Sequence, residues 1–146
     1  MKITVETVVN AKLKEVWTAW SNPDDIKQWN SPHESWHTTS SAVDLREGGR
    51  FNARMEAKDG SAGFDFEGTY TRVVPNKIID FRMSDGREVN VEFVERSGSV
   101  LVRETFDAET ENSEEMQRAG WQAILDNFGR HVQRHVSMEA ATQLRS

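Results

Sequence analysis

Residues 33 to 37 read HESWH and match the H-E-x-x-H pattern. In zinc metalloproteases this pattern places two imidazoles on one face of a helix, with the glutamate beside them as a general base. The chemistry requires His33 and His37 to lie one helical turn apart, a third ligand, and Glu34 directed at a metal-bound water. The pattern therefore indicates a hydrolase only if this segment is a helix.

The residues around HESWH favour a strand over a helix. Pro32 suits the first position of a helix, but the Ser and Thr residues of 35–41 are poor helix formers, and the segment continues at strand spacing. In an extended segment His33 and His37 lie more than about 12 Å apart, at roughly 3.3 Å per residue, which is too far for one tetrahedral metal ion. We therefore expect no zinc site here. His33 is predicted in a solvated loop and His37 at the start of a strand, near the rim of a pocket.

Two other histidines, His131 and His135, are four residues apart in a segment of helical periodicity. This spacing can bind a metal ion, but no carboxylate or third histidine is evidently placed to complete the ligand set. We interpret both as residues on the surface or beside the core, where the dipole at a helix C-terminus favours cations. Gly48-Gly49 lies between two strands and is predicted to form a turn, not a phosphate-binding loop. We expect no metal and no other cofactor.

Composition narrows the class of protein. The chain has 146 residues, enough for one domain, and its five Trp and seven Phe supply bulky apolar side chains for a core. The absence of cysteine excludes disulfides, thiolate nucleophiles and zinc–thiolate sites. A net charge of −6 with scattered Lys and Arg argues against a nucleic-acid partner. No apolar run has membrane-spanning length and no signal peptide is evident, so we expect a cytoplasmic protein without a membrane partner.

The elements that must position any site begin with a strand and two short helices. Residues 3–9 alternate apolar and polar side chains, which indicates a half-buried strand. Residues 13–20 carry apolar side chains at i, i+3, i+4 and i+7, which is one helical stripe, and the breaker Ser21-Asn22-Pro23 ends it. Residues 24–29 predict a second short helix, with two aspartates near its positive end.

From about residue 35 the apolar period changes to two. Five turn signals separate six predicted strands: Glu47-Gly48-Gly49, Asp59-Gly60, Val74-Pro75-Asn76, Ser84-Asp85-Gly86 and Ser97-Gly98. Strands joined by such short loops must be antiparallel neighbours, because a parallel crossover needs a dozen or more residues. The pattern predicts a meander with one apolar face that needs a cover.

The last segment predicts a long helix that supplies the cover. Asn112 followed by Glu115 is typical of a capping box. The apolar stripe repeats at a helical period and consists of Met116, Gly120, Trp121, Ile124, Leu125, Phe128, Val132 and Val136. We predict one α+β domain over residues 1–138, with a frayed tail at 139–146 and a strongly bent sheet around the final helix. The gap between sheet and helix is where we expect a pocket.

The order of elements and several strings resemble a known family. "VWTAWSNPDDIKQW", "DLREGGRF", "FDFEGTY", "VVPNKIIDF" and "GWQAILDNF" are similar to the single-domain bacterial members of the heat-shock protein 90 ATPase activator homologue family. That family lies within the START-like, or SRPBCC, superfamily, which includes the Bet v allergen-like proteins. The resemblance covers residues 3 to about 136. It implies a helix-grip fold, in a superfamily that holds lipid carriers, hormone receptors and aromatase/cyclases, and a setting in the stress response.

The candidate ligand-binding residues are large side chains of the sheet, the final helix and the roof formed by the short helices. They are Trp29, Trp36, His37, Phe51, Phe66, Tyr70, Phe81, Phe93, Trp121, Leu125 and Phe128. Together they offer more large apolar side chains than one helix covers, which leaves room for a small guest, although the core explains the helix residues equally well. Charged strand residues normally face water, but one that points inward becomes a polar anchor; the candidates are Arg54, Asp65, Glu67 and Glu104. No acid–base pair is identified by spacing, and we assign no catalytic residue.

Three functions remain as hypotheses. The first is binding of a small hydrophobic or aromatic molecule between the sheet and the final helix, by a monomer or weak homodimer. The second is a cyclase- or hydrolase-type enzyme that uses a polar residue in the same cavity. The third, implied by the resemblance, is a module that binds a chaperone partner. The eukaryotic activator docks on the chaperone through a further N-terminal domain, which we do not expect in this chain.

Overall fold

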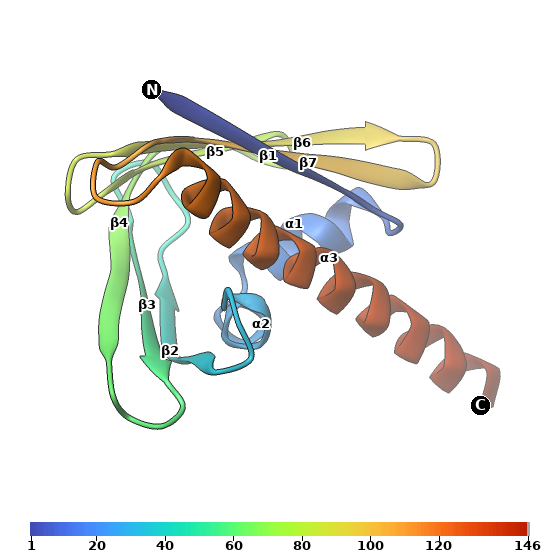
Figure 1. Cartoon of the computed structure of the whole chain (residues 1–146). Helices are drawn as coiled ribbons and strands as arrows, with labels where there is room; N and C mark the ends of the chain where they lie inside the picture. The colour runs from blue at the N-terminus through green and yellow to red at the C-terminus, as the bar shows by residue number, and fades with distance from the viewer. Residues whose placement is uncertain (146) are drawn as a thin grey trace.

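The molecule consists of one seven-stranded sheet, two short helices and one long C-terminal helix (Figure 1). The computed structural model describes residues 1–145, with side chains described through residue 139. In chain order the elements are β1 (Lys2–Val9), α1 (Leu13–Ser21), α2 (Pro23–Trp29), β2 (Trp36–Val43), β3 (Arg50–Ala57), β4 (Gly63–Val74), β5 (Ile78–Met83), β6 (Glu88–Arg96), β7 (Ser99–Asp107) and α3 (Glu114–Arg145). This order confirms the predicted α+β helix-grip fold.

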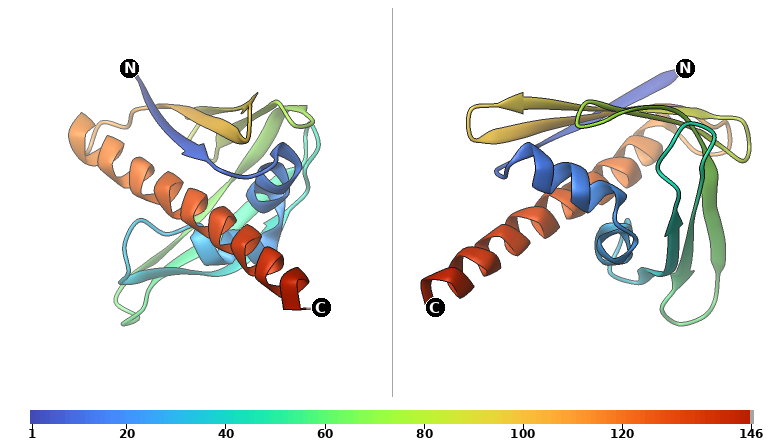
Figure 2. Two further views of the ribbon diagram at one scale, coloured as in Figure 1. Left: turned by 90° about the vertical axis from the view of Figure 1, so that its right-hand side faces the viewer. Right: turned by 180° about the vertical axis from the view of Figure 1, so that it is seen from behind.

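The sheet is antiparallel throughout and strongly bent. Its strand order is β1-β7-β6-β5-β4-β3-β2, so β1 and β2 form the two edges. The register shifts between Thr38 and Ser40 in β2 and between Tyr70 and Arg72 in β4. Such irregularities increase local bending. In Figure 2 strands β2 to β4 stand at a steep angle to the rest of the sheet, and α3 crosses the hollow side diagonally.

The five predicted turns join the six strands of the meander as expected. Each contains one residue with a positive φ, the conformation in which glycine and asparagine meet little steric cost. These residues are Gly48, Gly60, Asn76, Gly86 and Gly98. Local turn chemistry therefore sets the connectivity of the sheet.

The two short helices meet at Asn22. Its backbone N–H ends α1 by donating to the carbonyl of Thr18 (2.9 Å), and its side chain caps α2 by accepting from the N–H of Asp24 (2.9 Å). The indole N–H of Trp29 then donates to the carbonyl of Ala19 (3.0 Å), which ties α2 back onto α1. Asn22 thus ends α1 and caps the start of α2. The two helices together form a bent roof over the sheet.

The start of α3 differs from the prediction by one residue. Ser113, not Asn112, caps the helix, because its hydroxyl accepts from the N–H of Met116 (3.1 Å). In this helix Met116 faces outward and is 63% exposed, whereas Gln117 is buried. The buried Gln117 amide donates to the carbonyl of Asn112 (2.9 Å) and so holds the preceding loop. The predicted apolar stripe therefore begins inside the helix, not at Met116.

Helix α3 is seated on β1. Arg118 donates to the carbonyl of Thr4 (2.8 Å) and Gln122 donates to the carbonyl of Glu6 (2.9 Å). Carbonyls of an edge strand are otherwise open to pairing with another chain. Side chains of α3 therefore both position the helix and protect this edge.

In the part of the chain that the structure describes, no helix is long and apolar enough to cross a membrane. The proposed domain of residues 1–138 and its frayed tail stay predictions. Helix α3 is assigned to Arg145, whereas the side chains of residues 140–145 and all of residue 146 lie outside the described residues.

Candidate functional site

A cavity of about 340 Å³ lies between the bent sheet, the end of α2 and the first half of α3. Its walls are mostly apolar and aromatic. The lining residues are Trp20, Ile26, Trp29, Asn30, Pro32, Ser41, Ala42, Val43, Phe51, Asn52, Ala53, Met55, Phe64, Phe66, Tyr70, Phe81, Met83, Arg87, Glu104, Gly120, Trp121 and Ile124. This volume is at the small end of the range for ligand sites, which suits a molecule of one or two rings.

The sheet wall of the cavity is an aromatic cluster centred on Phe51. Its ring centroid lies 5.7 Å from Phe66, 5.2 Å from Tyr70 and 4.9 Å from Phe81. Phe66 also meets the edge of Trp121 on α3, with centroids 6.3 Å apart. Neighbouring strands β3, β4 and β5 supply the cluster, so the antiparallel register brings together residues that are distant in sequence.

The first half of α3 packs on β1 and β7 but stands off strands β3 to β5, where the cavity lies. At Gly129 an added Cβ would lie 3.5 Å from the Thr7 hydroxyl and 3.7 Å from a Val9 methyl carbon. At Gly120 it would meet nothing within 4 Å. Gly120 thus lines open space, whereas Gly129, more than two turns later, lies close to β1. The cavity fills the space under the part of α3 that stands off.

Glu104 is the acidic group of the cavity. It follows Val100 and Val102 on the inward face of β7, where parity places it at a core position, and it is 6% exposed. Its strand neighbours in register are Val5 and Val91, both apolar and buried. Burial away from water raises the pKa of Glu104 to about 8. At neutral pH this carboxyl is therefore mostly protonated and can donate a hydrogen bond.

Two hydroxyl groups add polarity to the apolar walls. Ser41 on β2 lines the cavity, and its Oγ is buried without a hydrogen-bond partner among the described residues. Burial also raises the pKa of the Tyr70 phenol, the nearby negative charge of Asp44 adding to the effect, so this group stays protonated. A buried polar atom without a partner is costly, and a ligand that bonds to it recovers part of that cost.

The structure divides the predicted ligand-binding residues into two groups. Six line the cavity: Trp29, Phe51, Phe66, Tyr70, Phe81 and Trp121. Their role in binding stays a prediction. The other five lie outside the lining: Trp36, His37, Phe93, Leu125 and Phe128.

Phe93, Leu125 and Phe128 belong to the packed core. Phe128 is fully buried, with its ring centroid 5.0 Å from both Trp20 and Trp29. Phe93 meets Trp20 edge-on at 5.9 Å. The two short helices fill the space beneath the middle of α3, so Leu125 and Phe128 contact protein and not the ligand cavity.

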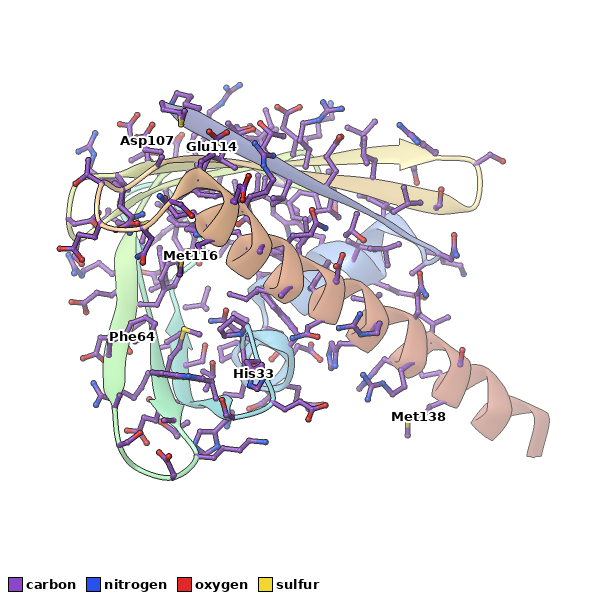
Figure 3. All side chains as sticks on the ribbon, in the orientation of Figure 1. His33, Phe64, Asp107, Glu114, Met116 and Met138 are labelled. Atoms are coloured by element: carbon purple, nitrogen blue, oxygen red, sulfur yellow. The ribbon has the colours of Figure 1, made fainter. Side chains whose placement is uncertain are left out.

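Trp36 and His37 lie at the start of β2, away from the cavity lining. Trp36 contacts Phe64 of β4 with ring centroids 5.9 Å apart, whereas His37 is exposed. Phe64 itself lines the cavity while remaining 47% exposed (Figure 3), and sequence periodicity gave no indication of that role. The bulge that follows Thr38 changes which side chains of β2 face inward, so Ser41 and Val43 line the cavity instead of His37.

Of the four charged strand residues, Glu104 alone lines the cavity. Arg54 pairs with Glu56 (3.1 Å) and Asp65 (3.4 Å), while Glu67 accepts from the amide of Asn52 (3.0 Å). Arg54, Asp65 and Glu67 do not line the cavity, and each already has a polar partner. The alternating apolar residues Val100, Val102 and Phe106 were the signal for Glu104, since they fix the parity of this strand.

HESWH is not helical. His33 lies in a turn beside α2 (Figure 3), where its Nδ1 accepts from the N–H of Ser35 (3.1 Å). His37 lies on strand β2. Both histidines are exposed. The predicted conformation of this segment is thereby confirmed.

We expect the double variant His33→Ala, His37→Ala to keep the stability of the parent. Exposed side chains away from caps and networks change the free energy of unfolding by about 0.5 kcal/mol or less. Urea denaturation of both proteins measures the difference. The hydrolase interpretation would be restored if the variant lost several kcal/mol of unfolding free energy, or if the parent held stoichiometric zinc that the variant lacked.

His131 and His135 have a carboxylate neighbour that sequence spacing did not reveal. Asp25 Oδ1 lies 2.8 Å from His131 Nε2, across a separation of 106 residues in the chain. The two imidazole rings lie 5.3 Å apart. His131 is therefore buried between helices, whereas His135 is exposed as expected.

Comparison with known proteins identifies relatives of this chain. A family model described as "Activator of Hsp90 ATPase homolog 1-like protein" matches residues 10–133. A search of curated proteins gives no match.

Solved structures of bacterial proteins share the fold over nearly the whole chain. An AHSA1-like protein from Aeromonas hydrophila is 52% identical, with a TM-score of 0.87, over 92% of this chain and 94% of that one. A protein from Cytophaga hutchinsonii is 40% identical, with a TM-score of 0.78, over 93% of this chain and 94% of that one. A protein from Nitrosomonas europaea is 18% identical, with a TM-score of 0.81, over 92% of this chain and 96% of that one, and this likeness concerns the fold alone.

Proposed function

We propose, from the premise that this chain belongs to the family of activator of Hsp90 ATPase homolog 1-like proteins, that it binds a small hydrophobic or aromatic molecule in the cavity beneath α3. The observation that carries the proposal is the cavity itself, about 340 Å³ of space under the part of α3 that stands off the sheet. Family membership alone does not name a ligand, because function depends on the site.

The shape of the walls favours a flat guest. The edges and faces of Phe51, Phe66 and Phe81 meet at steep or tilted angles, and Trp121 adds a further ring from α3. Aromatic rings prefer offset-stacked or edge-to-face contacts, so a planar ring finds several such partners here. An aliphatic chain would gain apolar burial without these directional contacts.

The polar groups favour a guest with one uncharged acceptor. Protonated Glu104 can donate to a carbonyl, ether or hydroxyl oxygen, and the Ser41 hydroxyl can donate or accept. A carboxylate guest would lose its hydration in a mostly apolar cavity, and the lining residue Arg87 already pairs with Asp85 (2.8 Å). We therefore place neutral ring compounds ahead of fatty acids.

A substitution at Gly120 should block the cavity without harming the fold. Gly120→Leu adds a side chain whose Cβ meets no atom within 4 Å and which extends into the cavity, and it removes a glycine that weakens the helix by about 1 kcal/mol relative to alanine. We expect the variant to melt at or above the parent temperature while its affinity for flat aromatic probes falls about tenfold or more, a change of about 1.4 kcal/mol or greater. Fluorescence titration and amide shifts by NMR measure binding.

The matched control is Gly120→Ala, which gives the same gain in helix propensity but adds only a methyl group. It should bind the probes nearly as the parent does. Equal affinity in parent and Gly120→Leu would place the probes outside the cavity. Absence of saturable binding by any probe class in the parent would leave the binding proposal without support.

An enzyme of cyclase or hydrolase type is the second candidate, favoured by Glu104. A carboxyl with a pKa near 8 in an apolar cavity is able to deliver or accept a proton at neutral pH. Structural burial alone also shifts such groups, so the shift does not identify a reaction. Turnover of a bound compound that is abolished by Glu104→Gln would favour this function over simple binding.

Chaperone binding is the third candidate, and the family name is its support. It predicts a partner on the outer surface instead of a guest in the cavity, and the Gly120→Leu variant would leave it intact. A cytoplasmic location, a role in the stress response and a monomeric or weakly dimeric state also stay proposals for this chain.

A further inference from the structure

A second hollow of about 300 Å³ lies where α1, α2 and α3 meet, and it shares no lining residue with the ligand cavity. Its walls carry an unusual share of groups able to bind metals. The lining residues are Lys14, Glu15, Thr18, Ala19, Asp25, His131, Val132, His135, Val136 and Glu139. Each of the three helices contributes one acidic residue: Glu15 from α1, Asp25 from α2 and Glu139 from α3. Helix α3 also contributes both histidines.

Three of these side chains already lie at near-ligating distances from one another. The ligand atoms of Asp25, His131 and His135 all lie within 4.8 Å of one another, and Asp25 Oδ1 is 2.8 Å from His131 Nε2. Ligands of a tetrahedral zinc ion, each about 2.0–2.2 Å from the metal, are separated by roughly 3.3–3.5 Å. The groups therefore need only small side-chain rotations to surround one ion.

Glu15 supplies an independent indication. Its Oε2 is buried and has no hydrogen-bond partner among the described residues, although the residue lines the same hollow. A carboxylate oxygen without a partner is expensive to bury, and a cation is the partner that recovers most of that cost. Lys14 also lines the hollow but does not form a hydrogen bond that satisfies this oxygen.

We propose that Asp25, His131 and His135, with Glu15 as fourth ligand, form a binding site for a divalent transition-metal cation such as Zn²⁺. Imidazole nitrogen with carboxylate oxygen suits zinc and its neighbours in the first transition row, not magnesium or calcium. On binding, the metal replaces the hydrogen bond between His131 Nε2 and Asp25 Oδ1, and both atoms become ligands. The ion joins all three helices, so it fixes the roof on α3.

Titration calorimetry with Zn²⁺ tests the site, using the full chain first stripped with a chelator and dialysed. We expect one equivalent bound per chain and a higher melting temperature in the presence of zinc, because a ligand of the folded state stabilises it. Amide shifts in NMR spectra should concentrate in α1, α2 and the second half of α3. Binding without saturation near one equivalent would overturn the proposal.

Variants distinguish these ligands from other zinc-binding groups. His135 is exposed and Glu15→Gln preserves shape, so His135→Gln and Glu15→Gln should fold normally, as circular dichroism can verify. We expect His135→Gln to weaken zinc binding by about 100-fold or more and Glu15→Gln by about tenfold. The matched control is the double variant His33→Ala, His37→Ala, which removes two exposed histidines elsewhere and should bind zinc as the parent does. Unchanged affinity in His135→Gln or in Glu15→Gln, or an equal loss in the control, would overturn the four-ligand site.

Discussion

Glu104→Gln is expected to flatten the loss of folding stability that the parent shows between about pH 4.5 and pH 8. Burial raises the folded-state pKa of Glu104 to about 8 from its ordinary value of 4.5. A raised folded pKa means that the folded state holds the proton more tightly than the unfolded state. The stabilising contribution is therefore fully present below pH 4.5 and is lost as pH rises through 8.

The size of the effect follows from linkage. Each unit of pKa difference corresponds to about 1.4 kcal/mol, so keeping Glu104 protonated at pH 7 costs about 3 kcal/mol relative to the unfolded chain. Glutamine cannot ionise, so the variant should avoid this cost and gain stability relative to the parent as pH rises. Urea denaturation at several pH values between 4 and 9 measures how the free energy of unfolding changes with pH in the parent and in the variant.

An exposed glutamate provides the control for Glu104. Glu95 lies on β6 with its side chain in solvent, and Glu95→Gln removes one carboxyl of the same type from the sheet. We expect Glu95→Gln to retain the pH profile of the parent. A parent-like slope in Glu104→Gln would contradict the assignment of a raised pKa to the buried group.

The same group should make ligand binding depend on pH. If protonated Glu104 donates to a neutral ligand, affinity falls as pH rises through about 8, because ionisation removes the donor. Glu104→Gln retains a donor and should lose this dependence. Affinity that is flat from pH 6 to pH 9.5 in the parent would place Glu104 outside the ligand contact.

Local signals explain why the elements could be predicted. Each turn of the meander carries a glycine or asparagine suited to a positive φ, and the breaker at Asn22 both ends α1 and caps α2. These features act within a few residues, so they are visible in the sequence. The one-residue error at the start of α3 arose because Ser113 and Asn112 are both good capping residues, and packing of Gln117 selects the former.

Membership of the cavity could be predicted only in part, because it depends on where α3 stands off the sheet. Leu125 and Trp121 share one helical stripe, yet Leu125 is fully buried in the core while Trp121 lines the cavity. The difference comes from the two short helices, which cover one half of α3 and leave the other half open. A hydrophobic period carries no information about that cover.

The charged groups also depend in part on long-range packing that the local sequence does not reveal. Glu104 was one of four charged candidates in the sequence, and strand parity alone did not select it, because its burial depends on the position of β1 beside β7. The contact of Asp25 with His131 could not be predicted from spacing, because it spans 106 residues and the six strands between α2 and α3. Long-range contacts of this kind follow from the packed fold and not from spacing.

Trp121→Ala is expected to be among the most destabilising changes in α3, and Trp121→Phe to separate the core role of this residue from its ligand role. Trp121 stacks flat on Phe106, with centroids 3.9 Å apart and planes 9° apart, while it also lines the cavity. Truncation to alanine removes the whole indole from this stack. Changes of this type cost about 3–5 kcal/mol of unfolding free energy, a large share of the 5–15 kcal/mol typical of domains.

Phenylalanine at position 121 keeps a ring on Phe106 but shortens the wall of the cavity. We expect Trp121→Phe to lower the melting temperature modestly and to change the affinity for flat aromatic probes by a larger free energy than it changes folding. Phe128→Leu is the matched control, since Phe128 is fully buried in the core and does not line the cavity. That control should lower stability by more than Trp121→Phe does while leaving probe affinity unchanged. Urea denaturation and probe titrations of the parent, Trp121→Phe and Phe128→Leu measure stability and affinity. If both variants change the affinity equally, or if Trp121→Phe changes stability alone, Trp121 acts as a core residue and does not contact the probe.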